Sequence, residues 1–276
     1  MSIAHDLIPP QPAPPAPPRA FTLERLAGIV FMGVWLAAII AAGFSMVEGF
    51  SGDKFARYAP KLLSGLMITL ELVAVSIILG AILSLPIAFA RMSSNRLLST
   101  LSYGYVYLFR GTPLIAQLFL VYYGFGSFKS FWEGLGLWWF FREAYYCAIL
   151  SFALNTAAYQ AEILRGAIES VARGQVEACH ALGLNRFHAY RKVILPQAII
   201  VALRPYGNEI ILMIKASAIV SIVTVLDVMG ETRRAFSRTF DYQIYIWAAV
   251  IYLVIVEALR NLWNWLEARL TRHLKR

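Results

Sequence analysis

The sequence predicts an all-α integral membrane protein with about six transmembrane helices. Hydrophobic residues make up 59% of the 276 residues and charged residues only 15%, whereas a soluble domain carries roughly 25% charged residues. A spanning helix needs about 20 mostly apolar residues, and several stretches of that length are joined by short polar connections. Lipid must therefore cover much of the surface of the folded chain.

The N-terminal region, residues 1–25, contains the run PPQPAPPAPP. Proline removes backbone donors and favours the polyproline II conformation, so we expect a stiff or disordered tail, or a ligand for an aromatic groove on a partner. No basic segment directly precedes an apolar core there, which argues against an ordinary signal peptide. The first transmembrane helix is expected at residues 26–47.

Five more spans are expected along the rest of the chain. Glu71 and Pro86 interrupt the first of these five without ending it. The aromatic segment FWEGLGLWWFF, residues 131–141, is expected to be a short helix at the membrane interface. The five spans are placed at about residues 62–90, 101–125, 145–164, 197–226 and 245–266.

Charge and motif content exclude several classes of protein. The net charge of +9 is compatible with basic residues at membrane boundaries, and no nucleic-acid-binding pattern accompanies it. The chain contains no GxxxxGK[ST], HExxH, GxSxG or CxxC motif, so we expect no catalysis, no bound cofactor and no metal site. An even number of spans puts both termini on one side, and the loop charges favour the cytoplasm.

One long polar segment, EACHALGLNRFHAYRKVILP, interrupts the apolar pattern. Its first part has apolar residues at helical spacing, which predicts a short helix with one apolar face: Val176, Ala178, Ala181 and Leu182. Gly183 is expected to break this helix, and a second helical piece is expected to reach Pro196, where the next helix starts. Such a helix–turn–helix suits a groove on a soluble partner, although a surface loop without a partner is the plainer alternative.

This polar segment resembles the EAA loop of permease subunits in bacterial ATP-binding-cassette (ABC) importers. The family pattern is EAA, three residues, G, nine residues, I, one residue, LP, and the spacing here matches throughout. Cys179 replaces the second alanine and Val193 replaces the isoleucine. The residues that correspond to the motif, and that the resemblance assigns to coupling with the ATPase, are Glu177, Ala178, Cys179, Gly183, Val193, Leu195 and Pro196.

Further stretches resemble the polar amino acid branch of these permeases, and most closely the M-type subunits of histidine, arginine and opine importers. They are LFRGTPLIAQLFLVYYG, LNTAAYQAEILRGAIESVARGQ, GNEIILMIKASAIVSIV and RMSSN. The resemblance covers about residues 62–266. It implies a five-helix type I importer permease core with one extra N-terminal span, a cytoplasmic coupling loop at 166–196 and a basic cytoplasmic tail at 267–276.

The resemblance also implies a function and its partners. The chain is expected to carry polar, and more specifically basic, amino acids or opines across the bacterial inner membrane. The implied partners are an ATPase dimer that binds ATP and Mg²⁺, a periplasmic amino-acid-binding protein, and a related permease or a second copy of this chain. A gradient-driven secondary transporter and a permease of the same fold for another small polar solute are the alternatives.

Polar residues inside the expected spans mark a candidate substrate path, since each charge there costs about 2.5–3.5 kcal/mol on insertion scales. Arg110 can satisfy carbonyls released by a kink, or attract a substrate carboxylate, and a carboxylate at Glu209 suits a cationic amino acid. Packing alone is an equal explanation for several of them, and the pairs Glu162–Arg165 and Glu257–Arg260 have the spacing of intrahelical ion pairs. The path candidates are Arg110, Gly111, Thr112, Pro113, Gln117, Asn155, Asn208, Glu209 and Lys215.

Overall fold

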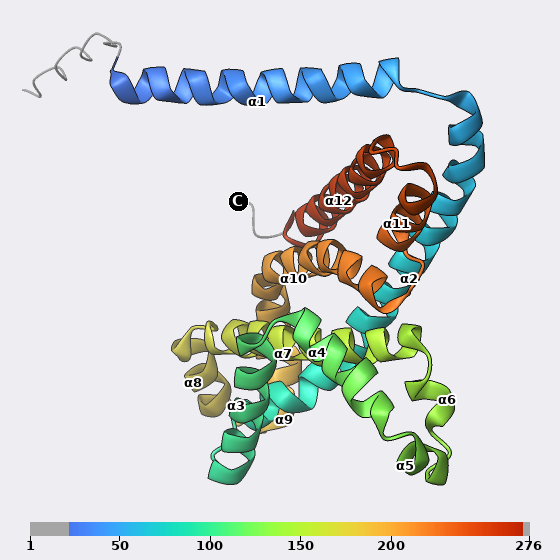
Figure 1. Cartoon of the computed structure of the whole chain (residues 1–276). Coiled ribbons are helices and arrows are strands. Elements are labelled where there is room, and N and C mark those ends of the chain that lie inside the picture. Colours follow the sequence, from blue (N-terminus) through green and yellow to red (C-terminus); the bar gives the residue numbers. More distant parts are fainter. Residues whose placement is uncertain (1–21, 273–276) are drawn as a thin grey trace, which may run out of the picture. The chain divides into compact units, whose positions relative to one another are not determined.

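The computed structural model describes residues 22–272, and every regular element in that range is a helix (Figure 1). The Pro-rich run and the last four residues of the basic tail lie outside the described residues. The first half consists of α1 (Leu23–Glu48), α2 (Gly52–Arg91), α3 (Arg96–Gly111), α4 (Leu114–Phe119), η1 (Leu120–Gly124), η2 (Phe125–Ser127), α5 (Lys129–Gly134) and α6 (Trp138–Phe141). The second half consists of α7 (Ala144–Glu169), α8 (Arg173–Ala181), α9 (Arg186–Ala189), η3 (Tyr190–Ile194), α10 (Leu195–Ser217), η4 (Ala218–Val223), α11 (Val228–Thr239) and α12 (Gln243–Leu270).

Helix α1 belongs to a separate unit that ends at Phe50, and it is described by itself. It starts at Leu23, before the expected residue 26, because the Thr22 side chain accepts a hydrogen bond from the backbone N–H of Arg25 and caps the helix. Its 26 residues correspond to about 39 Å, which is long enough to cross a bilayer core of about 30 Å.

In the unit from Ser51 onward, α7 is the central helix and contacts α2, α3, α4 and α10. Its buried face is rich in alanine, and small residues let neighbouring helices approach closely. The closest approach is at Gly80 of α2, where an added Cβ would lie 2.3 Å from the Thr156 side chain. The buried alanines of α7 therefore fix the spacing of the helices around it.

By length and composition, four continuous helical stretches of the described chain can cross a membrane: Leu23–Glu48, Gly52–Arg91, Arg186–Val223 and Gln243–Leu270. The pair Arg96–Gly111 and Leu114–Ser127 passes the same test as one span bent by 105°. Helix α7, which corresponds to the expected span at 145–164, is not among them, since it carries polar residues that protein rather than lipid covers. The described chain therefore has four or five stretches that can span a membrane, whereas the sequence predicted about six.

Helix α2 has 40 residues, with Pro60 and Pro86 inside it. This corresponds to about 60 Å, roughly twice the thickness of a bilayer core. Its polar first turns, which precede the expected span at residue 62, are tied to the link between α11 and α12 by an ion pair between Lys54 and Asp241 at 2.5 Å. The polar first turns of α2 therefore precede the apolar part of this helix that can span the membrane.

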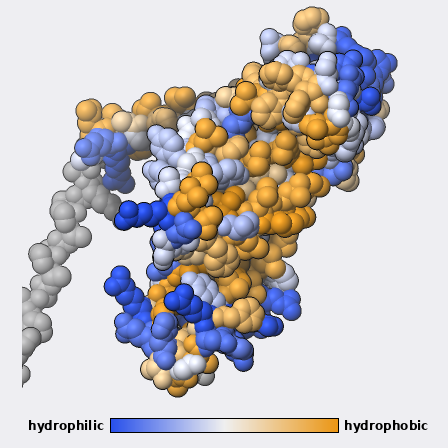
Figure 2. Space-filling model, turned by 90° about the horizontal axis from the view of Figure 1, so that it is seen from below, coloured by the Kyte–Doolittle hydropathy of each residue, from blue (hydrophilic) through white to orange (hydrophobic). Residues whose placement is uncertain are grey.

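The surface of the described chain has the apolar character that lipid contact requires. Figure 2 shows a broad hydrophobic area, with hydrophilic side chains gathered toward the ends of the view. Large apolar side chains are exposed on α2 and α12, among them Ile78, Ile82, Leu253 and Val254. Exposed apolar surface of this extent on a helical protein indicates a membrane environment.

Candidate translocation cavity and coupling segment

The bend between α3 and α4 is built by the sequence Arg110-Gly111-Thr112-Pro113. Helix α3 ends at Gly111, and Thr112 has extended backbone angles, φ −116° and ψ 147°. A residue before proline is driven out of the helical region, and proline has no N–H with which to continue the helix. The 105° bend at this point confirms the predicted kink.

Backbone carbonyls released by this bend are satisfied by two side-chain amides. Gln117 Nε2 donates to the carbonyl oxygens of Phe109 at 2.9 Å and Thr112 at 3.1 Å, and to Thr112 Oγ1 at 2.8 Å. Asn155 Nδ2 of α7 donates to the same Phe109 oxygen and to Gln117 Oε1, both at 3.0 Å. A backbone break at membrane depth needs such internal partners. These amides, rather than Arg110, therefore close the hydrogen bonding of the bend.

A cavity of 330 Å³ lies beside the bend, between α4, α7 and α10. Glu209 stands in its wall with only 7% of its surface exposed, and accepts a hydrogen bond from Thr156 Oγ1 at 2.9 Å. No basic side chain among the described residues lies within ion-pair distance of Glu209. We call this space the Glu209 cavity; its lining residues are Thr112, Pro113, Leu114, Asn155, Tyr159, Glu209, Leu212, Met213 and Ala216.

The remaining path candidates do not line the Glu209 cavity. Arg110 and Gly111 line a second cavity on the other side of Tyr159. Asn208 lies in a groove between α10 and α12, beside Trp263, because successive residues of a helix point in directions about 100° apart. Lys215 is exposed and lines neither cavity. Gln117 is buried within the bend.

Two polar residues of this region were not among the sequence candidates: Tyr159, which lines the Glu209 cavity, and Thr156, which donates a hydrogen bond to Glu209. Tyr159 follows Asn155 by four residues, and residues four apart share a helix face. That spacing is the signal that identifies Tyr159 from sequence. Thr156 has no such signal, because its role depends on the Glu209 carboxylate that α10 brings to it.

The polar segment forms the predicted helix–turn–helix. At the end of α8, the N–H of Gly183 donates to the His180 carbonyl and the N–H of Leu184 donates to the Cys179 carbonyl, both at 3.0 Å. This pair of bonds is a Schellman motif, which places its glycine in the left-handed region. Gly183 accordingly has φ +68°. The predicted break at Gly183 is confirmed.

The second helical piece reaches Pro196 as predicted, and Pro196 lies in the first turn of α10. Asn185 caps α9 by accepting a hydrogen bond from the His188 N–H at 2.9 Å, and the chain continues without interruption through η3 into α10. The π-helical turn η3, in which the Leu195 N–H bonds to the Tyr190 carbonyl, precedes Pro196. This wider turn accommodates a proline that cannot donate a backbone hydrogen bond.

The predicted apolar face of α8 is divided between two directions. Cys179 is buried, and Val176 is half-buried against the apolar cluster that contains Leu164 and Ile194. Ala178 and Ala181 are exposed, and Leu182 is 77% exposed. Phe187 of α9 is 65% exposed. The segment therefore offers Leu182 and Phe187 to a partner.

The other residues of the motif lie around these. Glu177 is exposed at the surface of α8, and Pro196 is exposed in the first turn of α10. Val193 and Leu195 are half-buried on either side of the buried Ile194. The motif thus combines side chains that anchor the segment with side chains that face outward.

The family model for a binding-protein-dependent transport system inner membrane component matches residues 76–272. The nopaline transport system permease protein NocM of Agrobacterium fabrum is 43% identical over 217 residues, which cover 78% of this chain and 90% of that protein. The histidine/lysine/arginine/ornithine transport system permease protein HisM of Escherichia coli is 38% identical over 213 residues, covering 77% and 90% respectively.

Solved structures share the arrangement of helices. An amino acid ABC transporter crystallised with histidines superposes with a TM-score of 0.70 and 35% identity, over 80% of this chain and 99% of that chain. The inward-facing MetNI methionine ABC transporter superposes with a TM-score of 0.66 over 80% of this chain and 100% of that chain, and its 19% identity makes it a likeness of fold alone.

Proposed function

The chain belongs to the family of binding-protein-dependent transport system inner membrane components, and we propose that it is the permease subunit of an ABC importer that carries basic amino acids or opines. The predicted resemblance and the all-helical permease fold are confirmed. The family match begins at residue 76, so α1 lies outside it. The relatives' substrates, nopaline and the amino acids histidine, lysine, arginine and ornithine, support this choice of substrate class.

The observation that carries the proposal for the substrate is the Glu209 cavity. Its wall contains a buried carboxylate, Glu209, which forms no ion pair among the described residues, although the Arg110 guanidinium is near enough to act on it electrostatically. A buried carboxylate attracts a cation much more strongly than an exposed one, because the effective dielectric constant around it is lower. We assign Glu209 to the cationic side chain of the substrate, while Gln117 and Asn155 hold the bend in place.

The exposed part of the polar segment is the proposed site of coupling to the ATPase. Leu182 and Phe187 project on a turn fixed by two backbone hydrogen bonds, and a rigid turn transmits displacement where a slack loop would not. ATP and Mg²⁺ bind to the separate ATPase subunits and this chain catalyses no reaction itself. The described residues contain no cluster of three or more potential metal-ligating side chains.

The proposed setting is the bacterial inner membrane, with both termini and the α8–α9 segment in the cytoplasm. A substrate-binding protein delivers the amino acid from the periplasm. The pore is completed by a second permease, either a related subunit or a second copy of this chain.

Reconstitution tests this proposal. The tagged chain is purified with its companions from its native membrane, the companions are identified by mass spectrometry, and the complex is placed in proteoliposomes with the binding protein. We expect an ATPase among the companions and accumulation of radiolabelled L-arginine only when ATP is supplied. Accumulation driven by an ion gradient without ATP would contradict the proposal.

A further inference from the structure

A second cavity, also of 330 Å³, adjoins the Glu209 cavity. Tyr159 lines both, while the neighbouring residues Gly111 and Thr112 line one each. The side chains that give the second cavity its chemistry are Arg91, Tyr107, Arg110, Tyr159 and Glu162; we call it the Arg110 cavity. The two cavities are therefore neighbours that meet at one tyrosine ring.

The Arg110 guanidinium covers this ring. Its Cζ atom lies 5.1 Å from the centre of the Tyr159 ring, which is a cation–π contact. Among the described residues no carboxylate lies within ion-pair distance of Arg110, and the carbonyls of the bend already receive hydrogen bonds from Gln117 and Asn155. Arg110 thus keeps its hydrogen-bond donors available for a ligand.

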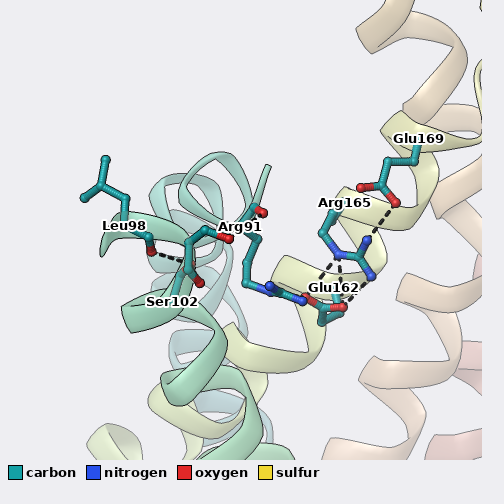
Figure 3. Close-up of polar contacts among 7 residues, drawn as sticks. Arg91, Leu98, Ser102, Glu162, Arg165 and Glu169 are labelled. Carbon is teal, nitrogen blue, oxygen red and sulfur yellow. Dashed lines mark hydrogen bonds and ion pairs between the residues drawn. The ribbon is translucent and has the colours of Figure 1, made fainter. Parts of the chain in front are cut away.

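The one carboxylate in the wall of the Arg110 cavity is already neutralised. Figure 3 shows Arg91 and Arg165 converging on Glu162 from two sides, at 2.9 Å and 2.8 Å, while Arg165 also pairs with Glu169 at 2.6 Å. In the wall of the cavity two arginines, Arg91 and Arg110, therefore stand against one glutamate, Glu162. The Arg110 cavity has an excess of positive charge, in contrast to the Glu209 cavity.

We propose that the Arg110 cavity is a second substrate station, in which Arg110 binds the carboxylate of the transported amino acid, and that the Arg110–Tyr159 pair is the partition between the two stations. The inference rests on the proposed function. An arginine suits this role because its guanidinium binds a carboxylate through two parallel hydrogen bonds. Binding of the carboxylate would draw Arg110 off the ring and open the way between the cavities.

The opposite charges of the two stations give transport a direction. The Glu209 cavity attracts the cationic side chain of a basic amino acid, and the positive Arg110 cavity repels it, so only the carboxylate holds the substrate there. Arg91 is the last residue of α2, and Glu162 belongs to the last turns of α7, which lead to the coupling segment. With that segment in the cytoplasm, the Arg110 cavity is the exit station.

The test compares ligands with and without a carboxylate on the purified complex. The probes are L-arginine and agmatine, which is arginine without its carboxylate. We expect the wild-type complex to prefer L-arginine, and Arg110→Gln to reduce that preference about tenfold, as expected for the loss of a charge-assisted hydrogen bond. Arg110→Lys, which keeps the charge, should retain most of the preference. Arg142→Gln, at an exposed arginine outside both cavities, is the matched control and should change nothing.

Size-exclusion chromatography first establishes that each variant complex is assembled, and Arg110→Met, which also removes the charge, serves as the variant if Arg110→Gln does not assemble. An unchanged L-arginine preference in an assembled Arg110→Gln or Arg110→Met complex, with ATP-driven uptake by the wild type intact, overturns the second station and leaves the proposed function standing. Absence of ATP-driven uptake by the wild type overturns the proposed function and this inference with it.

Discussion

The helix break at Gly111–Pro113 lies among apolar helices, and the break at Gly183 lies at the end of a polar one. The first needs two side-chain amides, Gln117 and Asn155, to satisfy the carbonyls that it releases. The second uses only backbone hydrogen bonds and a glycine with φ +68°. The difference follows from the surroundings, because unsatisfied backbone groups have no water available at membrane depth. The first break forms part of the wall of the Glu209 cavity, and the second places a turn at the protein surface.

The largest effect on stability is expected from Gln117→Leu, which removes the side-chain donor from the Thr112 carbonyl, one of the two donors from the Phe109 carbonyl, and the oxygen that accepts from Asn155. Leaving buried polar groups unsatisfied should lower the free energy of unfolding by about 1–3 kcal/mol. Thermal unfolding of the purified complex in detergent measures the loss. Gln197→Leu is the control, since Gln197 Nε2 makes one hydrogen bond, to the Val193 carbonyl of its own helix. Equal stability of the two variants would show that the amides do not maintain the bend.

Gly183→Val probes the exposed break. A side chain in the left-handed region costs about 1–2 kcal/mol, so the ratio of native to distorted turn should fall about 5- to 30-fold. No other atom lies within 4 Å of the position a Cβ would take, which confines the effect to the backbone of the turn. We expect ATP-driven uptake to fall while the complex unfolds at the same temperature.

Gly183→Asn is the matched control for this turn, because asparagine tolerates the left-handed region better than other residues with side chains. It should transport nearly as well as the wild type. If valine and asparagine were equally harmless, the geometry of this turn would have no part in coupling.

Leu182→Glu should leave stability within about 0.5 kcal/mol, because Leu182 is mostly exposed. We expect it to weaken retention of the ATPase subunits in detergent, which co-purification measures directly. Leu135→Glu, at an exposed leucine of the α5–α6 region, is the control and should retain them. If both variants retained the ATPase subunits, Leu182 on the α8–α9 turn would have no part in the contact with the ATPase.

The smallest effect is expected at the ion pair between Lys54 and Asp241. The hydrogen bond from the Lys54 ammonium lowers the pKa of the Asp241 carboxyl, so the stability that it contributes is present above the ordinary pKa of about 3.9 and disappears as the pH falls through the lowered value. Lys54 is 42% exposed, and screening limits the contribution to under about 1 kcal/mol.

Unfolding of Lys54→Met and of the wild type is therefore compared across this pH range. The stability difference should be present at neutral pH and shrink in acid. Lys192→Met, at an exposed lysine, should show no such change. A difference that persisted unchanged below the lowered pKa would mean that the ion pair is not its source.

Several features follow from sequence because they depend on local chemistry. Apolar runs near 20 residues locate the spanning helices, Gly111 and Pro113 locate the bend, and Gly183 locates the turn. The ion pairs Glu162–Arg165 and Glu257–Arg260 follow from a spacing of three residues and are present. Each of these needs no knowledge of how the helices pack.

Other features depend on packing and could not be derived from the sequence. That Gln117 and Asn155 meet at the Phe109 carbonyl depends on how α7 crosses the bend. The assignment of Glu209 and Asn208 to different cavities depends on the rotation of α10 about its axis. Helix α7 is less apolar than the other long helices because neighbouring helices cover it. Which helices cover it depends on the packing of the whole fold.

The most direct test of the account is ATP-driven uptake of radiolabelled L-arginine by the reconstituted complex, with the wild type and Gly183→Val side by side. The account predicts that the wild type accumulates arginine only with ATP, and that the variant, with its ATPase still bound and hydrolysing ATP, accumulates far less. Wild-type rates of uptake by the variant would contradict the central claim that the exposed turn at Gly183 couples the ATPase to transport.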